Sequence, residues 1–231
     1  MDRTELTGVA GVPETAISGA LVDRLPANEA PAPWDCVCEA VLWFGRGGAA
    51  ALQALPPALR DQAPGLAVVG AMVRYLETPV GAYDEVLGLV TSRSGVKPWG
   101  SVAFMSVDSE PSLVGGRTNW AMPKTLGAFD GSIGSGRTIT ASGADEVRWH
   151  VSATPRTVGP AVPLRTSPVT RQEFPGGRVG DSTMRGRGRI RPAVVTVDVD
   201  SDGPLPTWLR PGRHLGAVLE RGTFWLGEPR F

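Results

Sequence analysis

A lysine in an apolar stretch is the residue of this sequence best suited to covalent chemistry. Of the 23 basic side chains among 231 residues, only Lys97 and Lys124 are lysines. Lys124 lies in the segment GGRTNWAMPKTLGAF, where Trp120, Met122 and Phe129 are among its apolar neighbours. Burial favours the neutral form of an amine, and a neutral amine attacks a carbonyl carbon to form a Schiff base. The segment therefore indicates a lysine nucleophile, whereas Lys97, in a turn before a proline, is expected to be a solvated surface charge.

Other signatures of catalysis are missing from the sequence. The glycine-rich segment GSIGSG, at 131–136, is followed by the strand-like RTITASG, so it predicts a hairpin turn and not a dinucleotide-binding loop. The G-x-S-x-G, P-loop and HExxH motifs are absent. Cys36, Cys38 and the two histidines lack the spacing of a metal site, and we expect the cysteines to be reduced core thiols. We expect neither a metal ion nor a cofactor.

The composition argues against several classes of partner. The 23 acidic residues balance the 23 basic ones, which disfavours nucleic acid or an anionic membrane surface as a partner. No segment approaches the roughly 20 consecutive apolar residues of a transmembrane helix. The initial MDRTELTGV has no apolar region typical of a secretory signal. We therefore expect a soluble, cytoplasmic protein that binds neither nucleic acid nor membrane.

Short apolar runs separated by turn residues predict a mainly β protein. Residues 1–33 are expected to form an N-terminal helix, around Glu14 to Leu25, and a proline-rich connector. A second helix is expected at Gly48 to Arg60, where the Pro56–Pro57 pair ends it. Nine strands are expected, at Cys36 to Phe44, Leu66 to Glu77, Glu85 to Ser92, Ser101 to Val107, Thr138 to Ser142, Val147 to Ala153, Met184 to Arg191, Ala193 to Asp200 and Gly216 to Gly227. This pattern favours an antiparallel sheet or barrel, in a single domain that spans residues 1–231.

The last third of the chain holds two features that allow more than one interpretation. Residues 155–180 are rich in Pro, Thr, Gly and Arg without a sustained period, which predicts a long functional or mobile loop. An alternating row of arginines follows, at Arg185, Arg187, Arg189 and Arg191. On a strand all four would point to one side. The row is then a solvated face, or a site where one or two guanidinium groups bind a substrate carboxylate; nucleic acid is the weakest interpretation because no basic surplus exists elsewhere.

Two motifs resemble the acetoacetate decarboxylase-like family. Gly116-Arg117 precedes Pro123-Lys124 at the spacing that separates a Gly-Arg-Glu segment from Pro-Lys-Lys in that family. The segment ETPVGAYDEVLGLV resembles the family segment in which a glycine, an aromatic residue and a glutamate precede a strand, and Glu85 takes the position of an active-site acid. A weaker third match is VLWFGRGGAAALQALPPAL, so that the resemblance covers roughly residues 34 to 130.

The resemblance implies a fold, an activity and several residue roles. The fold would be mainly β (α+β), an antiparallel β-barrel-like domain with a few peripheral helices. Lys124 would form a Schiff base with a ketone or 2-oxo acid, and Glu85 would be the general acid and base; strand alternation turns Asp84 to the opposite side. The protein would be a homo-oligomeric carbon–carbon lyase, a decarboxylase or an aldolase-like enzyme, with a small carbonyl or carboxylate molecule as its partner. The residues expected to contact that molecule are Tyr83, Arg117, Trp120 and Met122.

Around the nucleophile the sequence departs from the family pattern. The second lysine of Pro-Lys-Lys is Thr125, the glutamate after Gly-Arg is Thr118, and a second active-site glutamate corresponds by counting to Gly70. The N-terminal substrate-side arginine of the family has no counterpart near the end of the proline-rich connector. Because the neighbouring ammonium that activates the family's lysine is missing, activation is expected from burial. Arg117 either holds a carboxylate or serves structurally by bonding backbone carbonyls.

Two other functions fit the same residues. The barrel could bind a small apolar or carboxylate ligand without covalent chemistry, which the replacements at Gly70 and Thr125 favour. It could instead isomerise or cyclise a natural product by acid–base chemistry, with Lys124 acting only as a charge. Only in this last case should Lys124→Arg retain activity.

Overall fold

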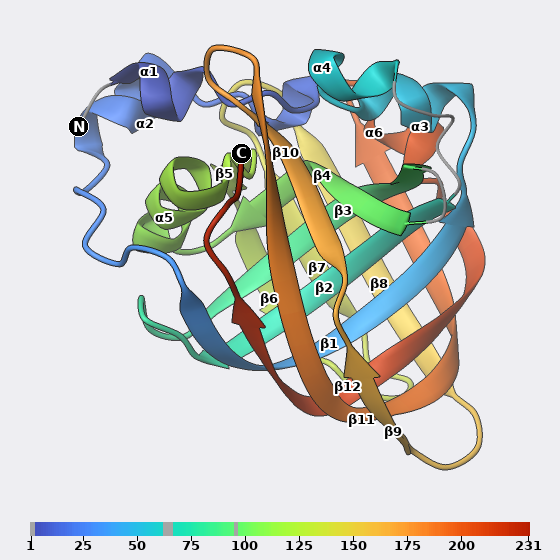
Figure 1. Ribbon diagram of the computed structural model, residues 1–231. Helices are drawn as coiled ribbons and strands as arrows, with labels where there is room; N and C mark the ends of the chain where they lie inside the picture. The colour runs from blue at the N-terminus through green and yellow to red at the C-terminus, as the bar shows by residue number, and fades with distance from the viewer. Residues whose placement is uncertain (1–2, 62–66, 95–96) are drawn as a thin grey trace.

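The computed structural model describes residues 3–61, 67–94 and 97–231, and its strands belong to one sheet (Figure 1). The strands are β1 (Trp34–Arg46), β2 (Ala67–Glu77), β3 (Tyr83–Ser94), β4 (Lys97–Val107), β5 (Lys124–Leu126), β6 (Ala128–Gly131), β7 (Ile139–Gly143), β8 (Trp149–Thr157), β9 (Val162–Thr166), β10 (Val169–Phe174), β11 (Arg178–Ser201) and β12 (Gly212–Leu226). The helices are α1 (Arg3–Thr7), the 3₁₀ turn η1 (Pro13–Thr15), α2 (Gly19–Arg24), α3 (Ala49–Ala54), α4 (Pro57–Arg60), α5 (Glu110–Trp120) and α6 (Leu205–Trp208). Leu66, predicted to begin the second strand, lies outside the described residues.

Part of this sheet closes into a ring. The pairing order runs β10-β4-β3-β2-β1-β12-β11, and β10 pairs with β11 as well, so the sheet returns on itself. The pairs around the ring are antiparallel except for one parallel pair between β10 and β4, which joins Thr170 to Gly100. Closure leaves the ring without an unpaired edge. The predicted fold class, a mainly β barrel-like domain with a few peripheral helices, is confirmed.

Alternating side chains give the ring an inside and an outside. On β1, Cys36 and Cys38 point inward and are buried, whereas Asp35, which precedes Cys36, is exposed. On β3, Tyr83 and Glu85 point inward. Because side chains on a strand alternate with a period of two, each strand turns one set of residues to the inside and the other to the outside.

A second hydrophobic core lies on the outer face of the ring. Beyond β11 the sheet continues through β8, β7 and β6. Side chains of β7 and β8 pack with outward-facing side chains of β1 to β4, and α3 and α6 contribute to the same cluster. Phe104 and Trp149 meet there edge to face, with ring centroids 5.1 Å apart. The inside of the ring therefore does not have to supply all of the buried apolar surface, and space remains in it for a cavity.

Short helices gather in two groups at the margins of the sheet (Figure 1). Helices α1, α2 and α5 form one group, and α3, α4 and α6 form the other. The predicted helix at Gly48 to Arg60 is two helices, because α3 ends at Ala54 and Pro57 begins α4, where its missing N–H is not needed. The predicted N-terminal helix is likewise divided into η1 and α2. Within the described residues, no helix is long and apolar enough to cross a membrane.

Helix α5 is absent from the sequence prediction. Its signals are an N-cap at Ser109, whose hydroxyl accepts from the Ser112 amide, and Pro111 in the first turn. The next turn contains Gly115 and Gly116, which have low helix propensity. A Cβ on Gly115 would lie 2.5 Å from the ring of Trp34. Packing against Trp34 thus requires glycine at position 115, although glycine disfavours a helix. For this reason the local sequence does not predict α5.

Two predictions for the C-terminal half are wrong. Residues 155–180 carry the end of β8 and the strands β9 and β10 in place of a long loop. The two strands predicted at Met184 to Arg191 and Ala193 to Asp200 are one strand, β11. Pro192 does not break it, because it falls between the last pair with β9, at Ile190, and the first pair with β8, at Ala193. A proline is tolerated in a strand where no ladder hydrogen bond needs its N–H.

One buried side chain ties β10 to β4 and so closes the ring. Oε1 of Gln172 accepts from the Ser101 hydroxyl and the Val102 amide, both at 2.8 Å. Its Nε2 donates to the carbonyls of Val102 and Ala121, both at 3.1 Å. Since a single backbone pair joins the two strands, the three hydrogen bonds from this amide to Ser101 and Val102 are an important part of the closure.

We expect Gln172→Met to weaken the closure. Methionine has a similar size, but it leaves two buried backbone groups of Val102 and the Ala121 carbonyl without their partner, at about 1–3 kcal/mol for each unsatisfied group. The free energy of unfolding in urea should fall by at least about 2 kcal/mol. Gln53→Met, at an exposed glutamine of α3, is the matched control and should change stability by less than about 0.5 kcal/mol. Equal stability of the two variants would contradict the role given to Gln172.

Candidate active site

The inside of the ring encloses a cavity of about 250 Å³, which we call the barrel chamber. Inward-facing side chains of β1 to β4 and β12 form its walls, which are almost entirely apolar. Tyr83 and Glu85 reach it from β3. Trp120, Met122 and Lys124 reach it from the end of α5 and the start of β5. Five of the predicted site residues thus lie around one cavity.

Lys124 and Glu85 form a buried ion pair at the wall of the chamber. Nζ of Lys124 donates to Oε2 of Glu85 at 2.8 Å and to the hydroxyl of Ser112 at 2.9 Å. Oε1 of Glu85 accepts from the Tyr75 hydroxyl at 3.1 Å. Lys124 is 3% exposed and Glu85 is 2% exposed. In such surroundings each charge depends on the other, because removal of one partner leaves an uncompensated buried charge.

Two tyrosines support the ion pair. The rings of Tyr75 and Tyr83 are stacked with centroids 4.4 Å apart, and Nζ of Lys124 lies 5.2 Å from the Tyr83 centroid, within reach of a cation–π interaction. Burial, and next the charge of Glu85, raise the pKa of both phenols well above the ordinary value. Both phenols therefore stay protonated at neutral pH, and Tyr75 remains a hydrogen-bond donor to the carboxylate.

The Gly116-Arg117 motif positions Lys124 through two separate contacts. A Cβ on Gly116 would lie 2.5 Å from Cδ and 2.6 Å from Cε of Lys124, so only glycine lets the lysine side chain pass the helix. Nε of Arg117 donates to the Lys124 carbonyl at 2.6 Å. Between them, Ala121 ends α5 in the left-handed conformation with φ of 50° and turns the chain back toward β5. The spacing between Gly116-Arg117 and Pro123-Lys124 is thus the number of residues needed to end α5 and turn back to β5.

Arg117 lies behind the chamber wall and is not among the described residues that line the cavity. Besides the Lys124 carbonyl, its guanidinium donates to the carbonyls of Leu6 and Thr15, which belong to α1 and η1. Burial lowers the pKa of Arg117 to about 10, which still leaves it charged at neutral pH. Of the two roles expected for this residue, its contacts correspond to the structural one: it ties the N-terminal segment to the strand that carries Lys124.

Both cysteines point into the chamber as buried thiols. Cys36 and Cys38 are free and line the cavity from β1. Burial raises the pKa of each thiol from 9.0 to about 12. Since the thiolate is the reactive form, these side chains act as apolar wall at neutral pH.

Asp84 and Gly70, two positions that the sequence analysis related to Glu85, both face away from the chamber. Asp84 points outward and pairs with Arg74 at 2.7 Å, as strand alternation predicts. Gly70, assigned by counting to a second active-site glutamate, faces away from the chamber, because a Cβ there would lie 2.1 Å from the Trp43 ring in the outer core. The predicted correspondence of Gly70 with a chamber position is therefore wrong. The chamber-facing residues of β2 are Val69, Ala71, Val73 and Tyr75.

Two partners of the ion pair were missed by the sequence analysis. Ser112 lies on the helix that was not predicted. Tyr75 could have been found from the strand pattern. It lies two residues after Val73, so both side chains are on the same face of β2, and it pairs with Tyr83 across the β2–β3 hairpin. The hairpin register thus places Tyr75 on the same face as Glu85.

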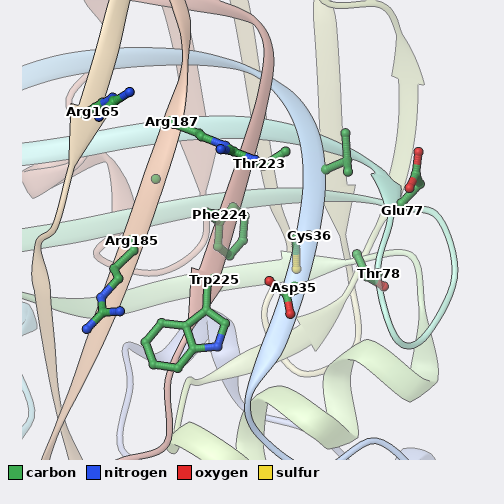
Figure 2. A pocket seen from close by; sticks show the side chains of 12 residues that line it. Asp35, Cys36, Glu77, Thr78, Arg165, Arg185, Arg187, Thr223, Phe224 and Trp225 are labelled. Atoms are coloured by element: carbon green, nitrogen blue, oxygen red, sulfur yellow. The ribbon is translucent and has the colours of Figure 1, made fainter.

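The arginine row lies outside the ring, on a separate groove of about 720 Å³ (Figure 2). Figure 2 shows Arg165, Arg185 and Arg187 on one side of this outer groove and Asp35 and Glu77 on the other. Arg185 stacks over Trp225 at 5.1 Å, and Arg187 donates to the Thr223 hydroxyl at 3.1 Å. Farther along β11, Arg189 donates to the Ala161 carbonyl and Arg191 pairs with Glu220. All four face one side, as alternation predicts, and that side is turned away from Lys124.

The protein is thus a closed β ring with a buried lysine–glutamate pair at its cavity, and a family comparison assigns it to a known family. The family model for acetoacetate decarboxylase (ADC) matches residues 31–158, more than half of the chain. The chain therefore belongs to the acetoacetate decarboxylase family. The sequence matches none of the curated proteins with which it was compared.

Solved structures with the same fold differ widely from this chain in sequence. An acetoacetate decarboxylase-like enzyme from Sphingomonas wittichii RW1 is 17% identical with a TM-score of 0.66, over 87% of this chain and 92% of that chain. The enduracididine biosynthesis enzyme MppR complexed with pyruvate is 20% identical with a TM-score of 0.60, over 87% and 90%. Acetoacetate decarboxylase from Legionella pneumophila is 13% identical with a TM-score of 0.60, over 90% of each chain. At such identities the similarity is one of fold.

We expect Gly116→Ala to destabilise the protein even though alanine favours helices. The added Cβ would overlap the Lys124 side chain, whose Nζ is held by two hydrogen bonds. Overpacking of this kind costs about 1–3 kcal/mol, more than the gain of up to ~1 kcal/mol in helix propensity. Urea unfolding should therefore show a net loss of stability. The control is Gly19→Ala in α2, where nothing lies within 4 Å. A Gly116→Ala variant as stable as the wild type would contradict the proposed clearance.

Thiol chemistry provides a test of burial in the chamber. Because the pKa of Cys36 and of Cys38 rises from 9.0 to about 12, the thiolate fraction at pH 8 falls roughly 1,000-fold. Ellman's reagent should react slowly with the native protein and quickly with both thiols in urea. The stabilising difference is fully present below pH 9.0 and is lost as the pH rises toward 12, by about 1.4 kcal/mol per thiol at pH 10. Replacing both cysteines by alanine should make the decline in unfolding free energy between pH 8.5 and 10 shallower; an unchanged slope would count against this assignment.

Proposed function

We propose that this protein is an imine-forming carbon–carbon lyase in which Lys124 condenses with a small ketone or 2-oxo acid. Glu85 is the general acid and base of the reaction, and Tyr83, Trp120 and Met122 surround the substrate. The observation that carries the proposal is the hydrogen-bonded pair of Lys124 and Glu85 at the wall of an otherwise apolar cavity. Such a pair joins a nucleophile to a group that can take its proton, which is the arrangement that covalent catalysis requires.

The first step in this proposal is proton transfer within the ion pair. A proton passes from the ammonium of Lys124 to the carboxylate of Glu85 along their 2.8 Å hydrogen bond, which leaves a neutral amine and a neutral acid. The amine nitrogen then bonds to the substrate carbonyl carbon, and the carbonyl oxygen takes up two protons and leaves as water. Overall the ammonium and the carbonyl become a protonated imine and one water, and Glu85 is again a carboxylate.

The protonated imine then accepts an electron pair. When the carbon adjacent to the imine carbon loses a carbon substituent, the electrons of the broken carbon–carbon bond move into the imine and form an enamine. Glu85, which is a carboxylate at this stage, takes up a proton from solvent and passes it to the enamine carbon, which restores the imine; water then releases the product from Lys124. The apolar walls strengthen the electrostatic interaction between the imine charge and Glu85.

Two further observations bear on this proposal. The enzyme MppR, which shares the fold, has been solved with pyruvate and with the condensation product of pyruvate and imidazole 4-carboxaldehyde, and this supports a small carbonyl compound as ligand. The family position of a second lysine is Thr125, which is buried. Activation of Lys124 in this chain is therefore assigned to Glu85, Ser112 and the apolar walls, since no second ammonium is adjacent among the described residues.

Non-covalent ligand binding is the second candidate, and the apolar walls of the chamber favour it. In that case a ketone would occupy the chamber with no bond to Lys124. The family resemblance further implies a homo-oligomer, whereas the single domain and the cytoplasmic location are expected from the sequence pattern. All three stay predictions, and light scattering coupled to size-exclusion chromatography checks the first.

Reductive trapping should label Lys124 and spare Lys97. Borohydride added with pyruvate, acetoacetate and a panel of neutral ketones, at pH values up to about 9, should yield a stable adduct on the Lys124 peptide by mass spectrometry. Lys97 is exposed and serves as a control within the same chain. Glu85→Gln should slow trapping by about 100-fold or more, as expected when a general acid–base is removed.

Lys124→Arg is the matched variant, because it keeps the positive charge and cannot form the imine. Its spectrum should contain no adduct. Absence of any wild-type adduct across the panel, or equal labelling of Lys97, would refute the imine. If a ketone then bound wild type and Lys124→Arg equally, the non-covalent barrel would be the better description.

A further inference from the structure

Most hydrogen-bond donors among the described residues of the barrel chamber are already engaged. The indole N–H groups of Trp34 and Trp120 donate to the carbonyls of Ala30 and Gly227 at 2.9 and 2.8 Å. The Thr170 hydroxyl donates to the Ser182 carbonyl at 3.2 Å. The remaining polar side chains of the wall are Tyr75, Tyr83, Glu85 and Lys124. Tyr75 and Lys124 both donate to Glu85, and Lys124 also donates to Ser112.

Lys124 offers little to a second anion. Two of the three protons of its ammonium point to Glu85 and Ser112. Once the imine forms, the nitrogen keeps a single proton, and Glu85 is the acceptor next to it. A carboxylate on the substrate would then lie beside the carboxylate of Glu85 without a donor of its own.

Arginine, the usual partner for a carboxylate, is missing from the chamber. Among the described lining residues, Lys124 is the single cation. Arg117 lies behind the wall, where each of its three guanidinium nitrogens donates to a backbone carbonyl. Arg185 and Arg187 line the outer groove, whereas the neighbouring Met184 on β11 lines the chamber.

From this donor inventory we infer that the chamber takes a neutral, apolar ketone or aldehyde and discriminates against carbonyl compounds that carry a carboxylate. The inference rests on the proposed function and narrows its substrate class. Burial of a carboxylate without hydrogen-bond partners is strongly unfavourable. Apolar walls can speed the loss of CO₂ from a carboxylate once it is bound, but they do not replace the hydration that the carboxylate loses on entry. At about 250 Å³ the chamber is at the small end of ligand cavities, which suits a short-chain compound.

A neutral substrate excludes decarboxylation from the proposed lyase chemistry and leaves the aldol-type reaction. Without a carboxylate the protonated imine cannot lose CO₂, and in a simple ketone, which has no aldol bond to break, the bond that breaks is a C–H bond at the neighbouring carbon. Its proton moves to the carboxylate of Glu85 and its electron pair moves into the imine, which produces a neutral enamine and a neutral acid. Return of a solvent-derived proton reverses the step, so a neutral ketone in D₂O should acquire deuterium at that carbon.

The test compares two compounds that differ at one group. 4-Oxopentanoate and 5-methyl-2-hexanone have the same ketone and nearly the same shape, with a carboxylate in one and an isopropyl group in the other. We expect 5-methyl-2-hexanone to half-saturate borohydride trapping of Lys124 at a concentration at least 10-fold lower, and to exchange its α-protons for deuterium by NMR. Half-saturation by 4-oxopentanoate at an equal or lower concentration would overturn the inference and leave the imine intact.

A matched pair of variants tests the cause of the selectivity. Met184→Arg adds a guanidinium to the chamber wall, since Met184 lines the cavity, and should reduce the preference at least 5-fold. Arg185→Met, the next residue on β11, changes the outer groove and should leave the preference unaltered. An unchanged preference in a folded Met184→Arg variant, or a loss in Arg185→Met, would refute the donor argument.

Failure of the proposed imine chemistry can be distinguished from failure of the ligand-class inference. If neither compound labels Lys124, the proposed function fails, and quenching of tryptophan fluorescence by the same two compounds decides the ligand class. A neutral ketone that binds at least 10-fold more tightly than 4-oxopentanoate would sustain the inference for a non-covalent site. Equal affinities, or tighter binding of the carboxylate, would overturn it.

Discussion

The buried ion pair between Lys124 and Glu85 is the constraint on which the rest of the site depends. Two opposite charges that are 3% and 2% exposed are stable only in contact with each other and with further hydrogen-bond partners. Tyr75 satisfies the second carboxylate oxygen and Ser112 satisfies a second ammonium proton. The pair therefore fixes the relative positions of β2, β3 and α5, which supply three of these four side chains.

Those side chains are distant in sequence, and the ring is what brings them together. Glu85 and Lys124 are 39 residues apart. The β2–β3 hairpin places Tyr75 beside Tyr83, and β4 carries the chain to α5, whose left-handed end at Ala121 returns it to β5. Gly116 and Arg117 act at this return, one by giving the lysine side chain room and the other by holding its backbone. The Gly116-Arg117 motif thus orients the Lys124 side chain toward the carboxylate of Glu85.

The same architecture separates two chemical environments. The inward face of β1, β11 and β12 is apolar, whereas their outward face carries Arg185, Arg187 and Asp35 along the outer groove. Charge on one face and its absence on the other follow from strand alternation. A family fold that surrounds a lysine can therefore change its ligand class through the inward-facing residues alone, and in this chain the described residues of that face include no arginine that could bind a carboxylate.

Much of this was determined by the sequence itself. Local patterns predicted the strands of the N-terminal half and the turn at 131–136, because alternation and turn chemistry are short-range signals. The apolar segment around Lys124 and the family resemblance at Glu85 singled out the two residues that the fold brings into contact. Tertiary structure decided what depends on distant partners. The glycines of helix α5 pack against Trp34 and Lys124, Gln172 joins β10 to β4, and strand pairing sets Gly70 against Trp43; none of these contacts is local in the sequence. Arg117 likewise could not be assigned from spacing, since its partners on α1 and η1 meet it only in the folded chain.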